Sequence, residues 1–235
     1  MTLLLALLAS YALGSIPAAY IAGKSRGIDL RKHGSGNLGA TNVFRVLGAK
    51  IGGAVFAFDM AKGAVPVLLF SRFVRANEIA SWPGDRRMLV QILCGVAAII
   101  GHVRPLWLRF GKGGKGVATS GGVFLALAPL QTLLAIAVFA ATVLATGYVS
   151  LGSLLTAVLL PVLLFIRDGA VSPMFVVCVL VAVFVFWSHR ANIGRLRRGE
   201  EHRFGKQKGR RNPAMVIAVG AVFAIAILVA VRFAR

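Results

Sequence analysis

The chain has 235 residues, of which 58% are hydrophobic, and its mean hydropathy is +0.82. It carries 27 Lys and Arg residues against seven Asp and Glu residues, a formal net charge of +20. A soluble domain spreads its charges along the chain, whereas here apolar runs near membrane-spanning length alternate with basic stretches. This pattern indicates an all-α polytopic membrane protein. It argues against a nucleic-acid partner, which needs a basic face on a soluble fold.

The first apolar run covers residues 2–23, and no Lys or Arg precedes it. A cleavable signal peptide begins with a positive segment, so we expect this run to be retained as the first span. The other apolar runs cover residues 52–71, 88–101, 117–188 and 213–233. Cys94 and Cys178 lie inside such runs, which indicates buried thiols rather than a disulfide or a metal pair.

Three polar stretches between these runs are strongly basic, namely residues 24–50, 102–116 and 189–212. Basic loops beside spans face the cytoplasm and its anionic lipids, so we expect the N-terminus to lie outside. The run 117–188 must then cross an even number of times, and four crossings of about 18 residues fit a bilayer better than two. We expect Pro129, Gly147 and the break at 167–169 to divide it into pieces of about 117–130, 131–146, 148–166 and 172–188. The first piece is short for a full crossing, and eight spans are expected in total.

The first basic stretch contains HGSGNLGATN at residues 33–42, which matches the G-x-G-x-x-G fingerprint of dinucleotide-binding folds. That fingerprint works between a buried strand and a helix, whereas this stretch follows a span and a basic turn. We interpret it as a loop whose glycines turn backbone N–H groups toward a phosphate. The alternative is a solvated interfacial turn. The predicted phosphate-binding residues are Gly34, Ser35, Gly36, Asn37, Gly39, Thr41 and Asn42, with Arg45 as a charged partner.

The second basic stretch is GHVRPLWLRFGKGGKGVATS at residues 101–120. We expect Lys112, Gly114 and Lys115 to bind phosphate, because the ammonium groups lie among glycines whose backbone can approach an anion closely. Gly116 follows Lys115 where a nucleoside-triphosphate loop needs Ser or Thr, so that motif is excluded. A basic interfacial hinge is the simpler alternative. His102 is either a general base or a structural hydrogen-bonding residue.

The third basic stretch begins with HRANIGRLRRGEEHRFG at residues 189–205. If it is helical, His189, Asn192 and Arg195 share a face at a spacing of three residues, and we expect that face to point into the site. The later arginines are more typical of lipid-headgroup anchors. In the second apolar run, Asp59 and Lys62 stand three residues apart, and pairing is enough to explain charges at that depth.

Together these stretches resemble the bacterial acyl-phosphate:glycerol-3-phosphate acyltransferase family. The matching segments are GSIPAAY at 14–20, GSGNLGATNVFRVLG at 34–48, FDMAKG at 58–63, GHVRPLWLRFGKGGKGVAT at 101–119 and HRANIGRLRRGEEHRFG at 189–205. The resemblance implies transfer of a long acyl chain from acyl phosphate to the 1-hydroxyl of sn-glycerol 3-phosphate. The products would be lysophosphatidate and inorganic phosphate, in the first step of bacterial phospholipid synthesis.

The resemblance also implies a location and a division of roles. The protein would lie in the bacterial cytoplasmic (inner) membrane, with its N-terminus outside and its site open to the cytoplasm. Arg45 and Lys115 would hold phosphate charge, while His189 and Asn192 would orient the glycerol phosphate or its reacting hydroxyl. A phosphate of the substrate would accept the proton, so no protein base is required. Residues 1–205 would form a seven-helix core, to which this chain adds an eighth span at 213–233.

The residues alone leave two other classes open. A membrane transporter of phosphate or an organophosphate is the main alternative, and a structural membrane protein is the third. Transporters place their sites near the midplane on broken helices and often have repeated halves, whereas these polar clusters lie at one face and show no repeat. Four widely separated histidines and few acids do not form a metal cage, and no cofactor is expected.

Overall fold

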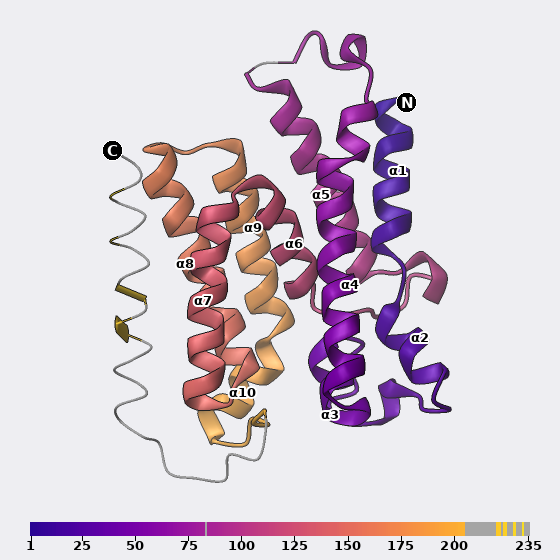
Figure 1. Cartoon of the computed structure of the whole chain (residues 1–235), viewed down its shortest axis with the longest axis vertical. Coiled ribbons are helices and arrows are strands. Elements are labelled where there is room, and N and C mark those ends of the chain that lie inside the picture. Colours follow the sequence, from indigo (N-terminus) through magenta and orange to yellow (C-terminus); the bar gives the residue numbers. More distant parts are fainter. Residues whose placement is uncertain (83, 205–219, 222, 225–227, 229–231, 233–235) are drawn as a thin grey trace. The chain divides into compact units, whose positions relative to one another are not determined.

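The computed structural model describes residues 1–82 and 84–204, together with 220–221, 223–224, 228 and 232. All secondary structure in these residues is helical, which confirms the all-α fold class (Figure 1). The predicted eighth span at 213–233 lies almost entirely outside them. The helices are α1 (Leu3–Gly14), α2 (Ala18–Lys24), α3 (Ala40–Leu47), α4 (Ala49–Leu68), α5 (Arg86–Val103), α6 (Val117–Leu127), α7 (Pro129–Thr146), α8 (Val149–Asp168), α9 (Pro173–Ser188) and α10 (Arg190–Arg198).

The chain forms two compact units, residues 1–127 and residues 128–235. Helices α1 to α6 belong to the first unit, and α7 to α10 belong to the second. The division falls at Pro129, where the sequence analysis expected a break. Pro129 begins α7, because its missing N–H leaves no hydrogen bond unmade in a first helical turn. The expected boundary after residue 205 stays a prediction.

Five helical segments are long and apolar enough to span a membrane, and the bent pair α9 and α10 makes a sixth. Helix α6 is apolar but has only 11 residues. Such a helix is about 16 Å long, which is too short for a hydrocarbon core of about 30 Å. The five segments, the bent pair and α6 together correspond to the seven helices predicted for the core. The short piece expected at 117–130 is confirmed, and the count of four crossings in 117–188 stays a prediction.

The helices of the first unit approach one another closely at glycines. A Cβ atom on Gly63 of α4 would overlap the carbonyl oxygen of Thr119 on α6, and one on Gly122 of α6 would overlap that of Met60. Gly14 of α1 meets the backbone of Ala98 on α5 in the same way. Small residues allow this contact, which drives association where lipid removes the hydrophobic force between helices. Close packing therefore explains Gly63 of α4 and Gly122 of α6.

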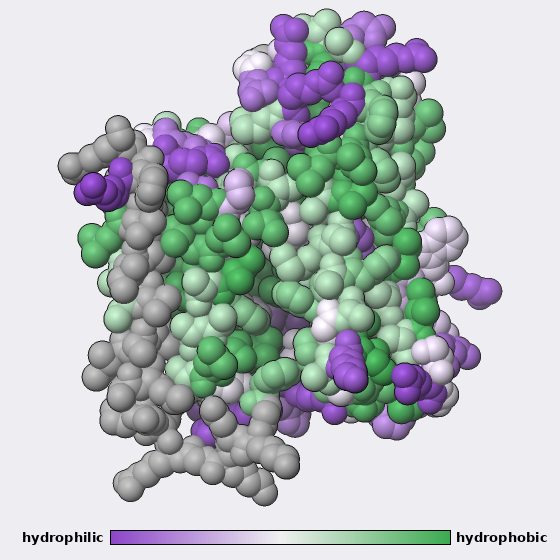
Figure 2. All heavy atoms as spheres, in the orientation of Figure 1, coloured by the Kyte–Doolittle hydropathy of each residue, from purple (hydrophilic) through white to green (hydrophobic). Residues whose placement is uncertain are grey.

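The two ends of the first unit carry different segments. The N-terminal ammonium donates a hydrogen bond of 2.9 Å to the carbonyl oxygen of Phe73, so the N-terminus lies beside the loop that follows α4. Helices α2 and α3 lie at the opposite end (Figure 1). Figure 2 shows hydrophilic residues at both ends of this unit and hydrophobic residues between them on the face in view. The glycine-rich segment 33–39 and the N-terminus thus lie at opposite ends of the first unit.

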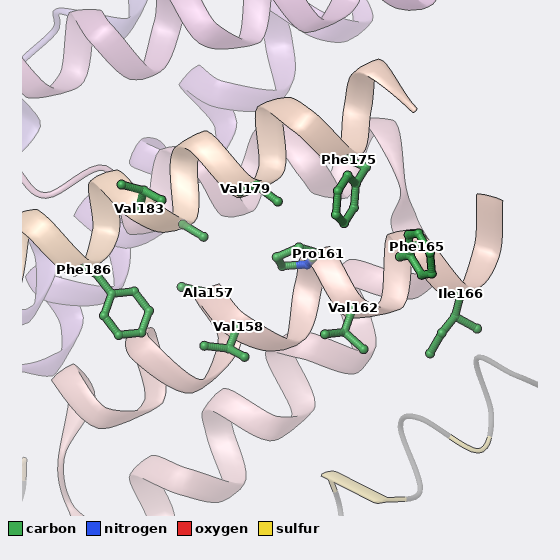
Figure 3. A pocket seen from close by; sticks show the side chains of 11 residues that line it. Ala157, Val158, Pro161, Val162, Phe165, Ile166, Phe175, Val179, Val183 and Phe186 are labelled. Carbon is green, nitrogen blue, oxygen red and sulfur yellow. The ribbon is translucent and has the colours of Figure 1, made fainter. Parts of the chain in front are cut away.

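The second unit contains an apolar groove between α8 and α9. Its volume is about 550 Å³, and its lining is aliphatic and aromatic. Figure 3 shows Pro161 and Phe165 of α8 facing Phe175 and Val179 of α9 across this space. Among the residues that the structure describes, no charged side chain lines it, so the groove suits an apolar chain rather than a headgroup.

Replacement of Gly63 by alanine should lower the free energy of unfolding by about 1–3 kcal/mol, because the added methyl group would overpack the contact between α4 and α6. Gly53→Ala on the same helix is the matched control, since its Cβ atom would meet nothing within 4 Å. That control should be neutral or stabilising, because Ala favours a helix more than Gly does. Thermal unfolding in detergent compares the two. Equal unfolding temperatures would contradict the close-packing interpretation.

Candidate functional site

The glycine loop, defined here as residues 33–39, leads into the N-terminus of α3. Gly34 and Gly36 have φ angles of 61° and 68°, a left-handed conformation that glycine adopts without steric cost. Gly34 also needs the space that its missing side chain leaves, because a Cβ atom there would overlap Oδ1 of Asn42. The shape of this loop therefore depends on glycine at both positions.

The side chain of Asn42 holds the glycine loop from within. Its Nδ2 donates hydrogen bonds to the carbonyl oxygens of Leu30, at 3.2 Å, and His33, at 3.0 Å. Its Oδ1 accepts a hydrogen bond of 2.8 Å from the backbone N–H of Ser35. Asn42 is only 1% exposed. The structure thus gives Asn42 a part in shaping the loop, while its contact with a phosphate stays a prediction.

The other predicted residues lie in the glycine loop and in α3, where Thr41 is in the first turn and Arg45 in the last turn. Ser35 is exposed, whereas Asn37, Thr41 and Arg45 are half-buried. Gly39 occupies the N-cap position, so no side chain caps the helix there. The N-terminus of a helix carries partial positive charge and N–H groups that attract anions. The structure therefore gathers neutral donors, a guanidinium and a helix N-terminus in one short segment.

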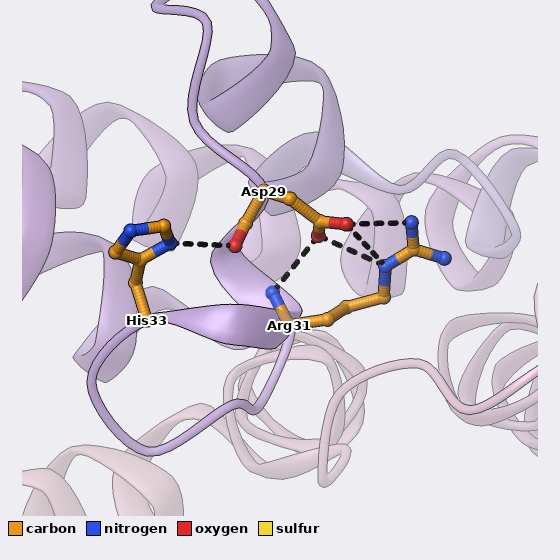
Figure 4. Close-up of polar contacts among 3 residues, drawn as sticks. All are labelled: Asp29, Arg31 and His33. Carbon is orange, nitrogen blue, oxygen red and sulfur yellow. Dashed lines mark hydrogen bonds and ion pairs between the residues drawn. The ribbon is translucent and has the colours of Figure 1, made fainter.

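An ion pair just before the glycine loop was missed by the sequence analysis. The carboxylate of Asp29 accepts hydrogen bonds from the Arg31 side chain and from its backbone N–H, and Nδ1 of His33 lies 2.9 Å from the Asp29 carbonyl oxygen (Figure 4). The hydrogen bonds from Arg31 lower the pKa of Asp29 to about 2. The Arg31 guanidinium also stacks over the ring of Tyr20, at 5.3 Å. An acid two residues before an arginine was the signal in the sequence.

The lysine loop, defined here as residues 111–116, connects α5 to the N-terminus of α6. Lys112 is exposed, whereas Lys115 is half-buried between buried glycines. A Cβ atom on Gly114 would overlap Nε2 of His102 and would lie 3.1 Å from the carbonyl oxygen of Leu38 in the glycine loop. The structure thus brings the first two predicted loops together, and the bare backbone at Gly114 is what permits their contact.

The predicted ion pair in the second span is confirmed. Nζ of Lys62 lies 2.7 Å from Oδ1 of Asp59, and both side chains are buried. Nδ1 of His102 lies 3.6 Å from the same carboxylate oxygen, and His102 is also buried. His102 is therefore part of a buried charged cluster at the end of α5 rather than an exposed surface residue.

The third basic stretch belongs to the second unit. Helices α9 and α10 meet at His189 with a bend of 57°. Nδ1 of His189 lies 2.8 Å from the carbonyl oxygen of Val185. A carbonyl oxygen can only accept, so this nitrogen carries the proton, and in a neutral ring Nε2 is the acceptor. The role of His189 in orienting a substrate stays a prediction.

Asn192 and Arg195 share a face of α10, as expected, and both bind Glu201. The carboxylate of Glu201 accepts hydrogen bonds of 2.6 Å from Asn192, 2.7 Å from Arg195 and 3.0 Å from the Ser150 hydroxyl. Burial raises the pKa of Glu201, but the hydrogen bonds from Asn192, Arg195 and Ser150 bring it below its ordinary value. Glu201 was not among the predicted site residues. Direct contact of Asn192 and Arg195 with a substrate stays a prediction.

Fold and site together define a multi-pass helical membrane protein with two adjacent, cationic, glycine-rich loops, each leading into a helix N-terminus. The family model of glycerol-3-phosphate acyltransferase matches residues 4–199 of this chain. The chain therefore belongs to the glycerol-3-phosphate acyltransferase family.

Individual relatives agree with this assignment. The glycerol-3-phosphate acyltransferase of Trichlorobacter lovleyi is 44% identical over 195 residues, which cover 83% of this chain and 94% of the relative. That of Chlorobium luteolum is 38% identical over 233 residues, covering 88% and 99% of the two chains.

Two solved structures are also similar to this chain. One is the glycerol 3-phosphate form of PlsY (YgiH), an integral membrane glycerol 3-phosphate acyltransferase. It matches with a TM-score of 0.75 and 38% identity, over 86% of this chain and 96% of that one. The lysophosphatidic acid form matches with a TM-score of 0.73 and 37% identity, over 86% and 95% of the chains.

Glu201→Gln should lower the free energy of unfolding by about 2 kcal/mol at neutral pH, because hydrogen bonds to a buried charge are lost. Since the folded-state pKa of Glu201 lies below its ordinary value of 4.5, the wild type should lose this stabilisation as the pH falls below 4.5. The variant should lack that loss. Thermal unfolding in detergent, followed by tryptophan fluorescence at neutral pH and below pH 4.5, measures both effects.

Glu200→Gln is the matched control for this experiment. Glu200 pairs with Arg198 at 2.7 Å, but both side chains are more than half exposed. An exposed ion pair contributes about 0–1 kcal/mol, so this variant should unfold almost as the wild type does. Equal destabilisation of the two variants would contradict the role assigned to the buried carboxylate of Glu201.

Proposed function

We propose that this protein transfers an acyl group from acyl phosphate to the 1-hydroxyl of sn-glycerol 3-phosphate, releasing lysophosphatidate and inorganic phosphate. The observation that carries the proposal is the contact of the lysine loop with the glycine loop at Gly114. Both substrates of this reaction carry a phosphate, so the site needs two anion-binding segments close together. Membership of the family supports glycerol 3-phosphate as the acyl acceptor. PlsY, a similar protein, has been solved in glycerol 3-phosphate and lysophosphatidic acid forms.

This reaction requires the protein mainly to position the two substrates and to stabilise the negative charge that develops on them. An acyl phosphate is a mixed anhydride, so its carbonyl carbon is already activated toward a hydroxyl group. The hydroxyl oxygen forms the new ester bond, the bond from the carbonyl carbon to the phosphate oxygen breaks, and phosphate leaves. Groups that orient the hydroxyl and stabilise charge on the carbonyl and phosphate oxygens lower this barrier. A phosphate of the substrate accepts the proton in this proposal.

The proposed roles follow the chemistry of the two loops. Backbone N–H groups around Gly34, Gly36 and Gly39 bind phosphate together with the neutral side chains, and Arg45 and Lys115 supply positive charge. The half-burial of these two cations supports the assignment, because a partly desolvated cation interacts more strongly with an anion than an exposed one. His189 and Asn192 orient the glycerol phosphate or its hydroxyl. Lys112, Gly114 and Arg195 complete the set of proposed phosphate-binding residues.

The proposal also includes a location and a surface for the acyl chain. The protein lies in the bacterial cytoplasmic membrane, with its N-terminus outside and the two loops facing the cytoplasm, as their basic character favours. The apolar groove between α8 and α9 offers an acyl chain a surface without charged groups. The acyl chain of the donor is apolar, as lipid tails are, so in this proposal the donor reaches the groove from the bilayer.

The decisive experiment uses purified protein with palmitoyl phosphate and labelled glycerol 3-phosphate. We expect formation of labelled lysophosphatidate with release of one phosphate for each acyl group transferred. A proteoliposome that takes up glycerol 3-phosphate without forming product would instead support a transporter. Palmitoyl-coenzyme A in place of palmitoyl phosphate should give no product, which tests the identity of the donor.

In the same assay, Lys115→Ala and Arg45→Ala should each lower kcat/KM by at least about 100-fold, because each removes positive charge from a preorganised site. Lys112→Ala is the comparison within the lysine loop, and its loss should be smaller because this side chain is exposed. Thermal unfolding confirms that the variants are folded. Near-normal turnover by either Lys115→Ala or Arg45→Ala would remove that residue from the site.

A further inference from the structure

A buried charged cluster lies beside the two loops and is formed by Asp59, Lys62 and His102. The side chains of Asp59 and Lys62 are 3% and 2% exposed, and their charged groups are 2.7 Å apart. His102 is 5% exposed, with Nδ1 at 3.6 Å from the same oxygen of Asp59. Burying charges is costly, so a pair retained in a span is expected to do more than fill space.

The charged cluster joins three separate helical segments of the first unit. Asp59 and Lys62 lie on α4, and His102 lies in the last turn of α5. Nζ of Lys62 also donates a hydrogen bond of 2.9 Å to the carbonyl oxygen of Ile16, in the break between α1 and α2. The carbonyl oxygen of Ile16 gives the buried ammonium a second acceptor, whereas the ion pair itself does not require the histidine.

The backbone and ring of His102 contact the lysine loop directly. The N–H of Gly114 donates to the carbonyl oxygen of His102 at 3.3 Å, and the N–H of Gly113 donates to that of Val103 at 3.0 Å. The ring presents Nδ1 to Asp59 and Nε2 to Gly114, where a Cβ atom would overlap it. The same position at Gly114 lies 3.1 Å from the carbonyl oxygen of Leu38 in the glycine loop.

We propose that Asp59, Lys62 and His102 are positioning residues for the acyl transfer. The charged cluster holds the ring of His102, the ring supports Gly114, and Gly114 sets the separation of the lysine loop from the glycine loop. That separation determines how the carbonyl of one substrate meets the hydroxyl of the other. The cluster acts through the loops and does not touch the substrates. This inference rests on the proposed function, because it concerns two phosphate-bearing substrates bound at once.

Two variants test the proposal, His102→Ala and the double variant Asp59→Asn/Lys62→Met. The double variant removes both charges together, so it leaves no unpaired charge in the span and keeps the test decisive if His102→Ala does not fold. Val90→Ala is the matched control. Val90 is fully buried and lies on α5, as His102 does, but about 18 Å away from it along the helix. The measurements are kcat, KM for each substrate, and amide hydrogen exchange of residues 111–117 in detergent.

The cluster variants should raise KM for at least one phosphate substrate by about 10-fold or more, since small displacements of binding groups have effects of this size. They should also speed amide exchange in the lysine loop, whereas Val90→Ala should leave both quantities unchanged. Wild-type KM values and wild-type exchange in the folded variants would overturn the proposal, whatever happens to kcat or stability. An inactive wild type would instead contradict the proposed function, and the exchange measurement would still test the positioning role.

Discussion

The contact at Gly114 is the point on which the site of the first unit depends. Only a residue without a side chain fits between the ring of His102 and the carbonyl oxygen of Leu38. This close approach places two cationic loops side by side, each of them leading into the N-terminus of a helix. The N-termini of α3 and α6 carry partial positive charge, and Arg45 and Lys115 supply the full charges that the proposed function assigns to phosphate binding.

The membrane explains why glycine has so many uses in this chain. Helices in lipid associate through close packing of small residues, and Gly14, Gly63 and Gly122 provide that contact. Gly34 and Gly36 instead provide left-handed backbone that turns the glycine loop. Polar groups inside the spans follow a matching rule, because each must find a partner within the protein. The pairing of Asp59 with Lys62 in α4 is a result of that rule.

The periodic and compositional features of the chain were predictable because they depend on local chemistry. Apolar runs of membrane length become helices, and Pro129 and the 167–169 break end or begin them where expected. The ion pair of Asp59 and Lys62 follows from their spacing on a helix. The short helix α6 agrees with the expectation that the segment before Pro129 is short for a full crossing.

Long-range contacts could not be read from the chain, because they join residues separated by many positions. Nothing local indicates that Ser150 donates a hydrogen bond to Glu201, that Lys62 donates one to the carbonyl oxygen of Ile16, or that Gly114 lies near Leu38 of the glycine loop. Composition and motif spacing were enough to establish the membrane class, the helices and the family, since these follow from the hydrocarbon environment and from segments close in sequence. Which groups face one another depended on how the helices pack, because packing alone brings distant residues within hydrogen-bonding distance.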